Sequence, residues 1–144
     1  LIGNYHKDKL QAQIDSFGLK EQFEIVGYVP HNVCIEHQVA SDVLVLIEGG
    51  GRGSDAFYTG KIFEYMNTNR PVLAILPKGC AADLVRESIV ADTDDVKAIK
   101  ECILNYYNAW VEGKLEFNPN RSVIEGFERK KLTEKLAEVF DKMY

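Results

Sequence analysis

The apolar run Val-Leu-Val-Leu-Ile at positions 43–47 constrains the fold of this chain most. Continuous apolar runs of this length are typical of parallel strands that are buried on both faces. A second apolar run follows at 71–76, and the segment 59–67 between the two runs has apolar residues at helical spacing. A strand, a helix and a second buried strand in this order predict an α/β fold with a parallel sheet.

The same alternation continues along the chain. We expect further strands at 1–3, 23–26 and 88–91, and helices at 8–17, 32–40, 81–87, 96–110 and 127–143, with a loop at 113–120. Thr93 or Asp94 is expected to cap the helix at 96–110. The alternation predicts one domain, 1–144, with a Rossmann-like parallel sheet and helices on both faces. The chain starts in a strand already under way, so we expect a fragment of a longer protein.

Three helices have apolar residues at the spacing of a buried face. The residues expected to face inward are Val33, Cys34 or Ile35, and Val39 in the helix 32–40, Ile99, Ile103, Tyr106 and Trp110 in the helix 96–110, and Leu132, Leu136, Val139, Phe140 and Met143 in the last helix.

Composition excludes several classes of function. The formal net charge is −5, and no cluster of five or more like charges occurs, which argues against a nucleic-acid binder. The cysteines, Cys34, Cys80 and Cys102, fit neither a zinc site nor a disulfide framework, and we expect reduced thiols in a cytoplasmic protein. No signal peptide or membrane-spanning apolar run is evident, and no metal site is expected.

The helix predicted at 59–67 has the features of an anion site. The first backbone N–H groups of a helix have no partner inside it, and Lys61 adds a positive charge at that end. Glu64 lies one turn further on the same face, where a carboxylate suits sugar hydroxyls. Helical spacing places Tyr65 and Thr68 on this outward side, and Ile62, Phe63 and Met66 on the buried side. A solvated surface helix remains the alternative.

The segment before this helix, 48–58, contains four glycines at 49, 50, 51 and 53. Glycines permit positive φ and close approach of another group to the backbone. A loop of this kind, between the carboxyl end of a buried strand and a helix start, is the usual ligand position in an α/β sheet. Neither the P-loop pattern nor the dinucleotide fingerprint is present. The sequence therefore argues against a nicotinamide or flavin cofactor.

Four segments in this order, at 27–32, 40–45, 60–66 and 70–74, resemble the C-terminal half of a retaining GT-B glycosyltransferase of family 4. The resemblance covers nearly the whole chain. It implies a domain that binds a nucleoside-diphosphate sugar, in an enzyme that transfers the sugar to a glycan or lipid-linked acceptor in polysaccharide biosynthesis. The N-terminal acceptor domain is then missing, and the isolated domain is expected to be inactive. No metal or other cofactor is implied.

The resemblance also assigns roles to residues, although it identifies no catalytic residue. It implies diphosphate contacts from Thr59, Gly60 and Lys61, a ribose contact from Glu64, base contacts from Tyr28, Val29 and His31, and donor-sugar contacts from Gly51, Ser54 and Asp55. The family motif has a glutamate eight positions before Glu64, where this chain has Ala56. That departure leaves the recognition of the donor sugar open.

The resemblance implies a cytoplasmic location, with peripheral association of the full-length enzyme at the inner face of the membrane as a further expectation. Two other interpretations of the sequence stay open. One is half of a GT-B sugar-nucleotide epimerase, which would need an acid or base near the sugar. The other is a non-catalytic α/β interaction module, which the loss of the glutamate at position 56 favours. Nucleotide binding distinguishes the module from the transferase.

Overall fold

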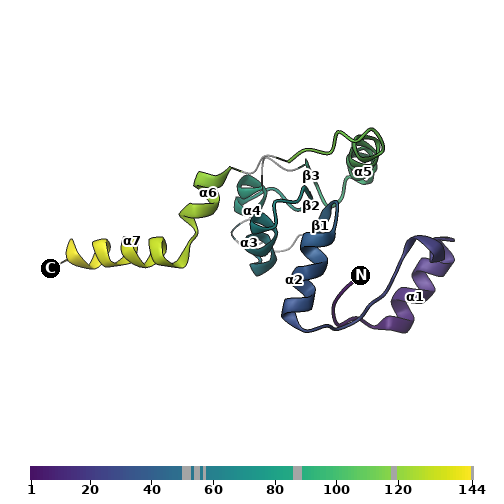
Figure 1. Cartoon of the computed structure of the whole chain (residues 1–144), viewed down its shortest axis with the longest axis horizontal. Helices are drawn as coiled ribbons and strands as arrows, with labels where there is room; N and C mark the ends of the chain where they lie inside the picture. The colour runs from purple at the N-terminus through teal and green to yellow at the C-terminus, as the bar shows by residue number, and fades with distance from the viewer. Residues whose placement is uncertain (50–52, 54–55, 57, 86–88, 118–119, 144) are drawn as a thin grey trace. The chain divides into compact units, whose positions relative to one another are not determined.

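The structure is a computed structural model of the chain that describes all residues except 50–52, 54–55, 57, 86–88, 118–119 and 144 (Figure 1). The elements are α1 (Lys7–Ser16), η1 (Lys20–Gln22), α2 (His31–Ala40), β1 (Leu44–Ile47), α3 (Gly60–Asn67), β2 (Val72–Ile75), α4 (Cys80–Leu84), β3 (Ile89–Ala91), α5 (Val96–Val111), α6 (Arg121–Gly126) and α7 (Arg129–Asp141). The chain divides into two compact units, Leu1–Ala40 and Ser41–Tyr144. The single domain expected from the sequence stays a prediction.

The first unit contains the two helices α1 and α2 and the short 3-10 turn η1. The segment predicted as a strand at 23–26 is not a strand, and one parallel bridge joins Ile2 to Gly27, the residue that follows it. The amide of Val26 donates to the carbonyl of Leu1 at 2.9 Å, and the amide of Gly3 donates to the carbonyl of Gly27 at 2.8 Å. The strand prediction is therefore wrong, because a partner segment this short supports only a bridge.

The two helices of this unit follow the predicted bounds closely. Gly18 ends α1 with φ of 68°, and its amide donates to Asp15 at 3.0 Å, as expected of a glycine that terminates a helix. In α2, the expectation that Val39 faces inward is wrong, because Val39 is exposed and its neighbour Gln38 is buried. The Gln38 amide donates to the thiol of Cys34, 3.6 Å away on the preceding turn.

The second unit is built on a parallel sheet in the order β1-β2-β3. Leu44 of β1 is in register with Val72 of β2, and Leu73 of β2 is in register with Ile89 of β3. Each strand is followed by a helix, which confirms the α/β class and the parallel pairing. The sheet is smaller than expected, since the predicted segments at 1–3 and 23–26 are not strands of it.

Helices pack against both faces of this sheet, as predicted. One face packs against α3, α4 and α6, in a core that centres on Leu46, Ile62, Val72 and Leu76. The other face packs against α5, where Cys102 contacts the cluster of Leu73 and Ile75. Both faces of β2 are consequently buried along its whole length.

The expectation that β1 is buried on both faces is wrong. Its residues alternate between buried and exposed, so Leu44 and Leu46 are in the core while Val45 and Ile47 are exposed. Val45 is in register with Leu73 and Ile47 is in register with Ile75, so both lie on the α5 side of the sheet. Because α5 packs against β2 and β3, its side chains leave this part of the face of β1 uncovered.

The helix α5 is rotated relative to the sequence prediction. Ile99 and Tyr106 pack inward as expected, whereas Ile103 and Trp110 are exposed and Cys102 is buried instead. The cap is also different. Asp95 begins the helix, and its carboxylate accepts a hydrogen bond from the amide of Ala98 at 2.9 Å, so neither Thr93 nor Asp94 is the capping residue.

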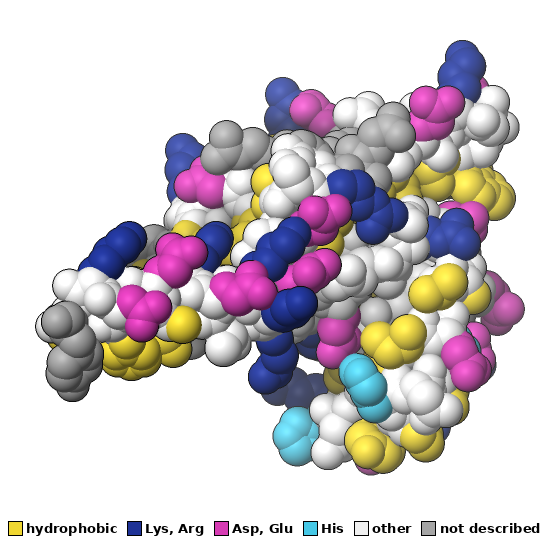
Figure 2. Space-filling model, turned by 60° about the vertical axis from the view of Figure 1, so that its left-hand side comes forward, with side chains coloured by type: hydrophobic (Ala, Val, Ile, Leu, Met, Phe, Trp, Pro, Cys, Tyr) yellow, Lys and Arg dark blue, Asp and Glu magenta, His cyan; other side chains and the backbone are white. Residues whose placement is uncertain are grey.

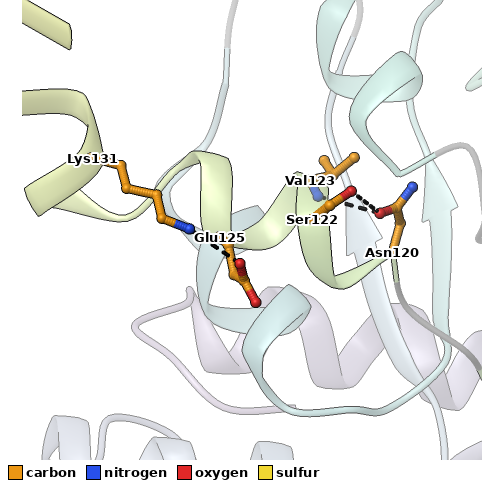
Figure 3. Close-up of polar contacts among 5 residues, drawn as sticks. All are labelled: Asn120, Ser122, Val123, Glu125 and Lys131. Carbon is orange, nitrogen blue, oxygen red and sulfur yellow. Dashed lines mark hydrogen bonds and ion pairs between the residues drawn. The ribbon is translucent and has the colours of Figure 1, made fainter. Parts of the chain in front are cut away.

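The C-terminal segment forms two helices where the sequence predicts one. The side chain of Asn120 starts α6 by accepting hydrogen bonds from the amide of Val123 at 3.3 Å and the hydroxyl of Ser122 at 2.7 Å (Figure 3). Lys131 near the start of α7 contacts Glu125 of α6 at 3.1 Å. The helix predicted at 127–143 is confirmed as α7, whereas α6 is a further helix that the sequence did not predict, and the chain leaves helical geometry after Gly126.

The apolar side of α7 is exposed, which contradicts the sequence expectation. Figure 2 shows hydrophobic side chains along one side of this helix and charged side chains along the other. The exposed apolar residues are Leu132, Leu136, Val139, Phe140 and Met143. The amphipathic pattern is present as predicted, but no face of the described structure covers it.

Candidate functional site

The candidate site is the start of α3, on the carboxyl side of β1. Ile62 is fully buried with 0% of its surface exposed, and Met66 is buried one turn later. Phe63 is half-buried against the same core. These three residues confirm the predicted buried face, and they fix the helix against the sheet so that its first turn is held in place.

The entrance to the first turn of α3 carries the residues that we expect to contact a diphosphate. Thr59 precedes the helix in an extended conformation, with φ of −79° and ψ of 145°, and its side chain makes no capping hydrogen bond. A Cβ atom placed on Gly60 would meet open space, so packing does not require a glycine there. Lys61 is exposed. The residues expected to contact a diphosphate thus surround a helix start without a side-chain cap.

The side of α3 that we expected to face outward is only partly available. Glu64 is half-buried and already has an interaction partner within the chain, which a ligand would have to share or displace. Tyr65 packs against the core, so its predicted outward position is wrong. The hydroxyl of Thr68 donates to the carbonyl of Tyr65 at 2.7 Å, which closes the last turn of the helix.

An aromatic cluster that sequence reasoning missed supports the start of α3. The ring of Tyr58 lies 6.0 Å from that of Phe63 and 6.1 Å from that of Phe127, and the two phenylalanine rings are 5.2 Å apart. Burial, the Cys80 thiol and the Asp83 carboxylate raise the pKa of Tyr58 above its ordinary value. An aromatic residue directly before a predicted helix start was the available signal, but its partner Phe127 is distant in sequence.

The other predicted site residues belong to the first unit or lie outside the described residues. Tyr28, with 81% of its surface exposed, belongs to the first unit with half-buried Val29 and exposed His31. Their role in base binding stays a prediction. Gly51, Ser54 and Asp55, predicted to contact the donor sugar, lie outside the described residues. Ala56 is exposed, and its amide donates to the carbonyl of Gly53 at 3.1 Å.

The described residues include three free thiols and no cluster of metal ligands. No group of three or more His, Cys, Asp or Glu residues in this part of the chain could hold a metal ion. Cys34, Cys80 and Cys102 are free thiols, and Cys102 is buried. None of the helices that the structure describes has both the length and the apolar composition needed to span a bilayer.

The chain was also compared with protein-family models, with curated proteins and with solved structures, and none of them matches it.

Proposed function

We propose that the start of α3 binds the diphosphate of a nucleoside-diphosphate sugar. The supporting observation is a combination of three features at the start of α3. Thr59 makes no side-chain cap, a Cβ atom on Gly60 would meet open space, and Lys61 is exposed. An anion at a helix N-terminus is stabilised by the amide groups and the helix dipole together. The dipole supplies only a partial positive charge, and the ammonium group of Lys61 adds a full one.

The remaining parts of the proposal follow from the sequence resemblance. The chain would be the donor-binding domain of a retaining GT-B glycosyltransferase with a Rossmann-like core, working with a separate acceptor domain at the cytoplasmic side of a membrane. Glu64 would bind the ribose hydroxyls, and the segment 28–31 would bind the base. The loop residues Gly51, Ser54 and Asp55 would contact the sugar.

In this proposal the domain aids transfer by stabilising the leaving diphosphate. The dipole of one helix contributes about 0.3–1 kcal/mol at an exposed site, and up to about 2 kcal/mol where it is partly buried. Hydrogen bonds to charged groups contribute about 1.5–3 kcal/mol each. The lysine and the amides are thus expected to dominate the binding of the diphosphate, and the isolated domain is expected to bind a donor without transferring its sugar.

Calorimetric titration of the chain with nucleoside diphosphates and with the corresponding nucleosides tests the proposal. Lys61→Ala should weaken diphosphate binding by about tenfold or more and leave nucleoside binding unchanged. The matched control is Lys97→Ala, because Lys97 is an exposed helical lysine whose ion pair with Glu101 is long at 4.0 Å. Equal losses for the two lysine variants, or equal losses for diphosphate and nucleoside, would contradict the assignment.

Gly60→Ala provides a second, independent arm. The added methyl group meets open space in the free protein, so the stability of the domain should be unchanged or slightly raised. It would stand between the backbone and a bound phosphate, so affinity for diphosphates should fall. If no nucleotide binds the unmodified chain at millimolar concentration, the non-catalytic interaction module becomes the better interpretation.

A further inference from the structure

Two adjoining cavities lie at the amino ends of β1 and β2, opposite the candidate diphosphate site. One has a volume of about 410 Å³ and the other of about 340 Å³. Asp42 and Trp110 border both cavities. Both are open to solvent, so a bound ligand would remain partly exposed there. Both cavities belong entirely to the second unit.

The wall contributed by α5 is aromatic. Tyr107 and Trp110 lie one turn apart, with ring centres 6.3 Å apart and ring planes inclined by 34°. Their exposed fractions are 59% and 52%, so both rings present surface to solvent. The neighbouring Tyr106 holds this part of α5 on the sheet, because its hydroxyl donates to the carbonyl of Val72 at 3.1 Å. Both rings therefore lie on a helix that is held on the sheet.

The polar wall combines opposite charges and an amide. Asp42 contributes an exposed carboxylate, and half-buried Arg70, which already has another interaction within the chain, contributes a guanidinium group. Asn69 has a φ of 58°, a left-handed conformation that is uncommon outside glycine. Its side-chain oxygen accepts a hydrogen bond from Arg121, which leaves the amide N–H₂ group as the donor. Donors and acceptors therefore border the same space.

We propose that these cavities bind a neutral carbohydrate of at least two sugar units. The apolar C–H face of one sugar ring would stack on Trp110 and Tyr107. The hydroxyl groups, which both donate and accept, would bond to Asp42, Arg70 and Asn69. This site is separate from the diphosphate site and does not depend on the proposed function.

The geometry favours a neutral sugar over two other ligands. A cation bound by aromatic faces would sit against the positive charge of Arg70, and an anion would sit against Asp42. Two neighbouring rings of one helix line the space from one side, whereas recognition of a quaternary ammonium group commonly uses several rings that enclose it. A sugar ring needs one flat apolar face and several hydrogen-bonding groups.

The experiment uses Trp110 as its own probe, since it is the single tryptophan of the chain. The full chain is titrated with maltose, cellobiose and N,N′-diacetylchitobiose, and tryptophan emission is followed. A saturable change with at least one disaccharide, and none with choline, is expected. Absence of saturation with all three disaccharides, or saturation with choline, would overturn the proposal.

Two variants connect the signal to the site. Asp42→Asn should weaken disaccharide binding by about tenfold, as expected for the loss of a charged hydrogen-bond acceptor. Asp94→Asn, at another exposed aspartate, should leave it unchanged. Binding of a nucleoside diphosphate should be the same in Asp42→Asn and in the unmodified chain, so that failure of one site is distinguished from failure of the other. Equal effects of the two variants on disaccharide binding would overturn the proposal.

Discussion

Replacing Ile62 by alanine tests whether the first turn of α3 is held by the core. Ile62 has none of its surface exposed and lies between the sheet and α3. The substitution removes three carbon atoms, and burial of about 0.8 kcal/mol per carbon gives a loss of about 2.4 kcal/mol. The cavity that remains adds to this, because a packed core relaxes only in part. We expect a total loss of about 3–4 kcal/mol in the free energy of unfolding.

Urea unfolding followed by far-UV circular dichroism measures this loss. The total stability of domains of this size is about 5–15 kcal/mol, so the variant should stay folded in the absence of denaturant, with a lower midpoint. Ile62→Val should cost about 0.5–1.5 kcal/mol, because it removes one carbon and leaves a smaller cavity.

The matched control is Ile103→Ala on α5, where the same side chain is 50% exposed. Its loss should be below about 1 kcal/mol, since alanine is the better helix former and little apolar contact disappears. If Ile62→Ala and Ile103→Ala destabilise the protein equally, Ile62 does not anchor α3. The presentation of Lys61 by a fixed helix would then lack its structural basis.

Three further predictions concern α5. Asp95→Ala removes the cap at the start of this helix and should cost about 1 kcal/mol in urea unfolding, whereas Asp94→Ala should cost almost nothing. Tyr106→Phe removes the hydroxyl bond to the main chain of β2 and should cost about 1 kcal/mol by the same assay, while Tyr107→Phe, at an exposed ring, should be neutral. Burial raises the pKa of the Cys102 thiol, with a smaller contribution from a neighbouring carboxylate, so it should react with a thiol-specific disulfide reagent more slowly than the other two thiols. The folded state keeps the thiol proton of Cys102 at pH values where the unfolded chain has lost it. The contribution of Cys102 to stability is therefore complete below the ordinary thiol pKa and falls as pH rises toward the raised pKa. Urea unfolding at increasing pH measures this fall.

The local pattern of residues predicted the central part of the second unit well. The strands β2 and β3 and the helix α3 lie close to their predicted bounds, and Ile62, Phe63 and Met66 form the predicted buried side. Helical and strand periodicities are local, so they depend on residues a few positions apart. The prediction of an anion site at Lys61 rests only on the position of a helix start, and it stays a prediction.

The extent of burial was predicted less well, because it depends on neighbours that are distant in sequence. The run at 43–47 has the composition of a fully buried strand, yet Val45 and Ile47 are exposed because α5 lies over β2 and β3. In α5, the rotation about the helix axis places Cys102 against the sheet and leaves Trp110 exposed beside Asp42. Helical spacing alone could not decide which of these two adjacent faces of α5 packs against the sheet.

The sequence by itself determined the alternation of helices and strands, the amphipathic character of each helix and the glycine and lysine at the start of α3, since each depends on a few consecutive residues. Only the tertiary structure decided which side chains those elements cover, because packing joins positions far apart in the chain. Tyr58 meets Phe127, and the segments before β1 and β2 meet the end of α5 around two cavities. These contacts follow from the directions in which the strands and helices cross, which no local pattern of residues specifies.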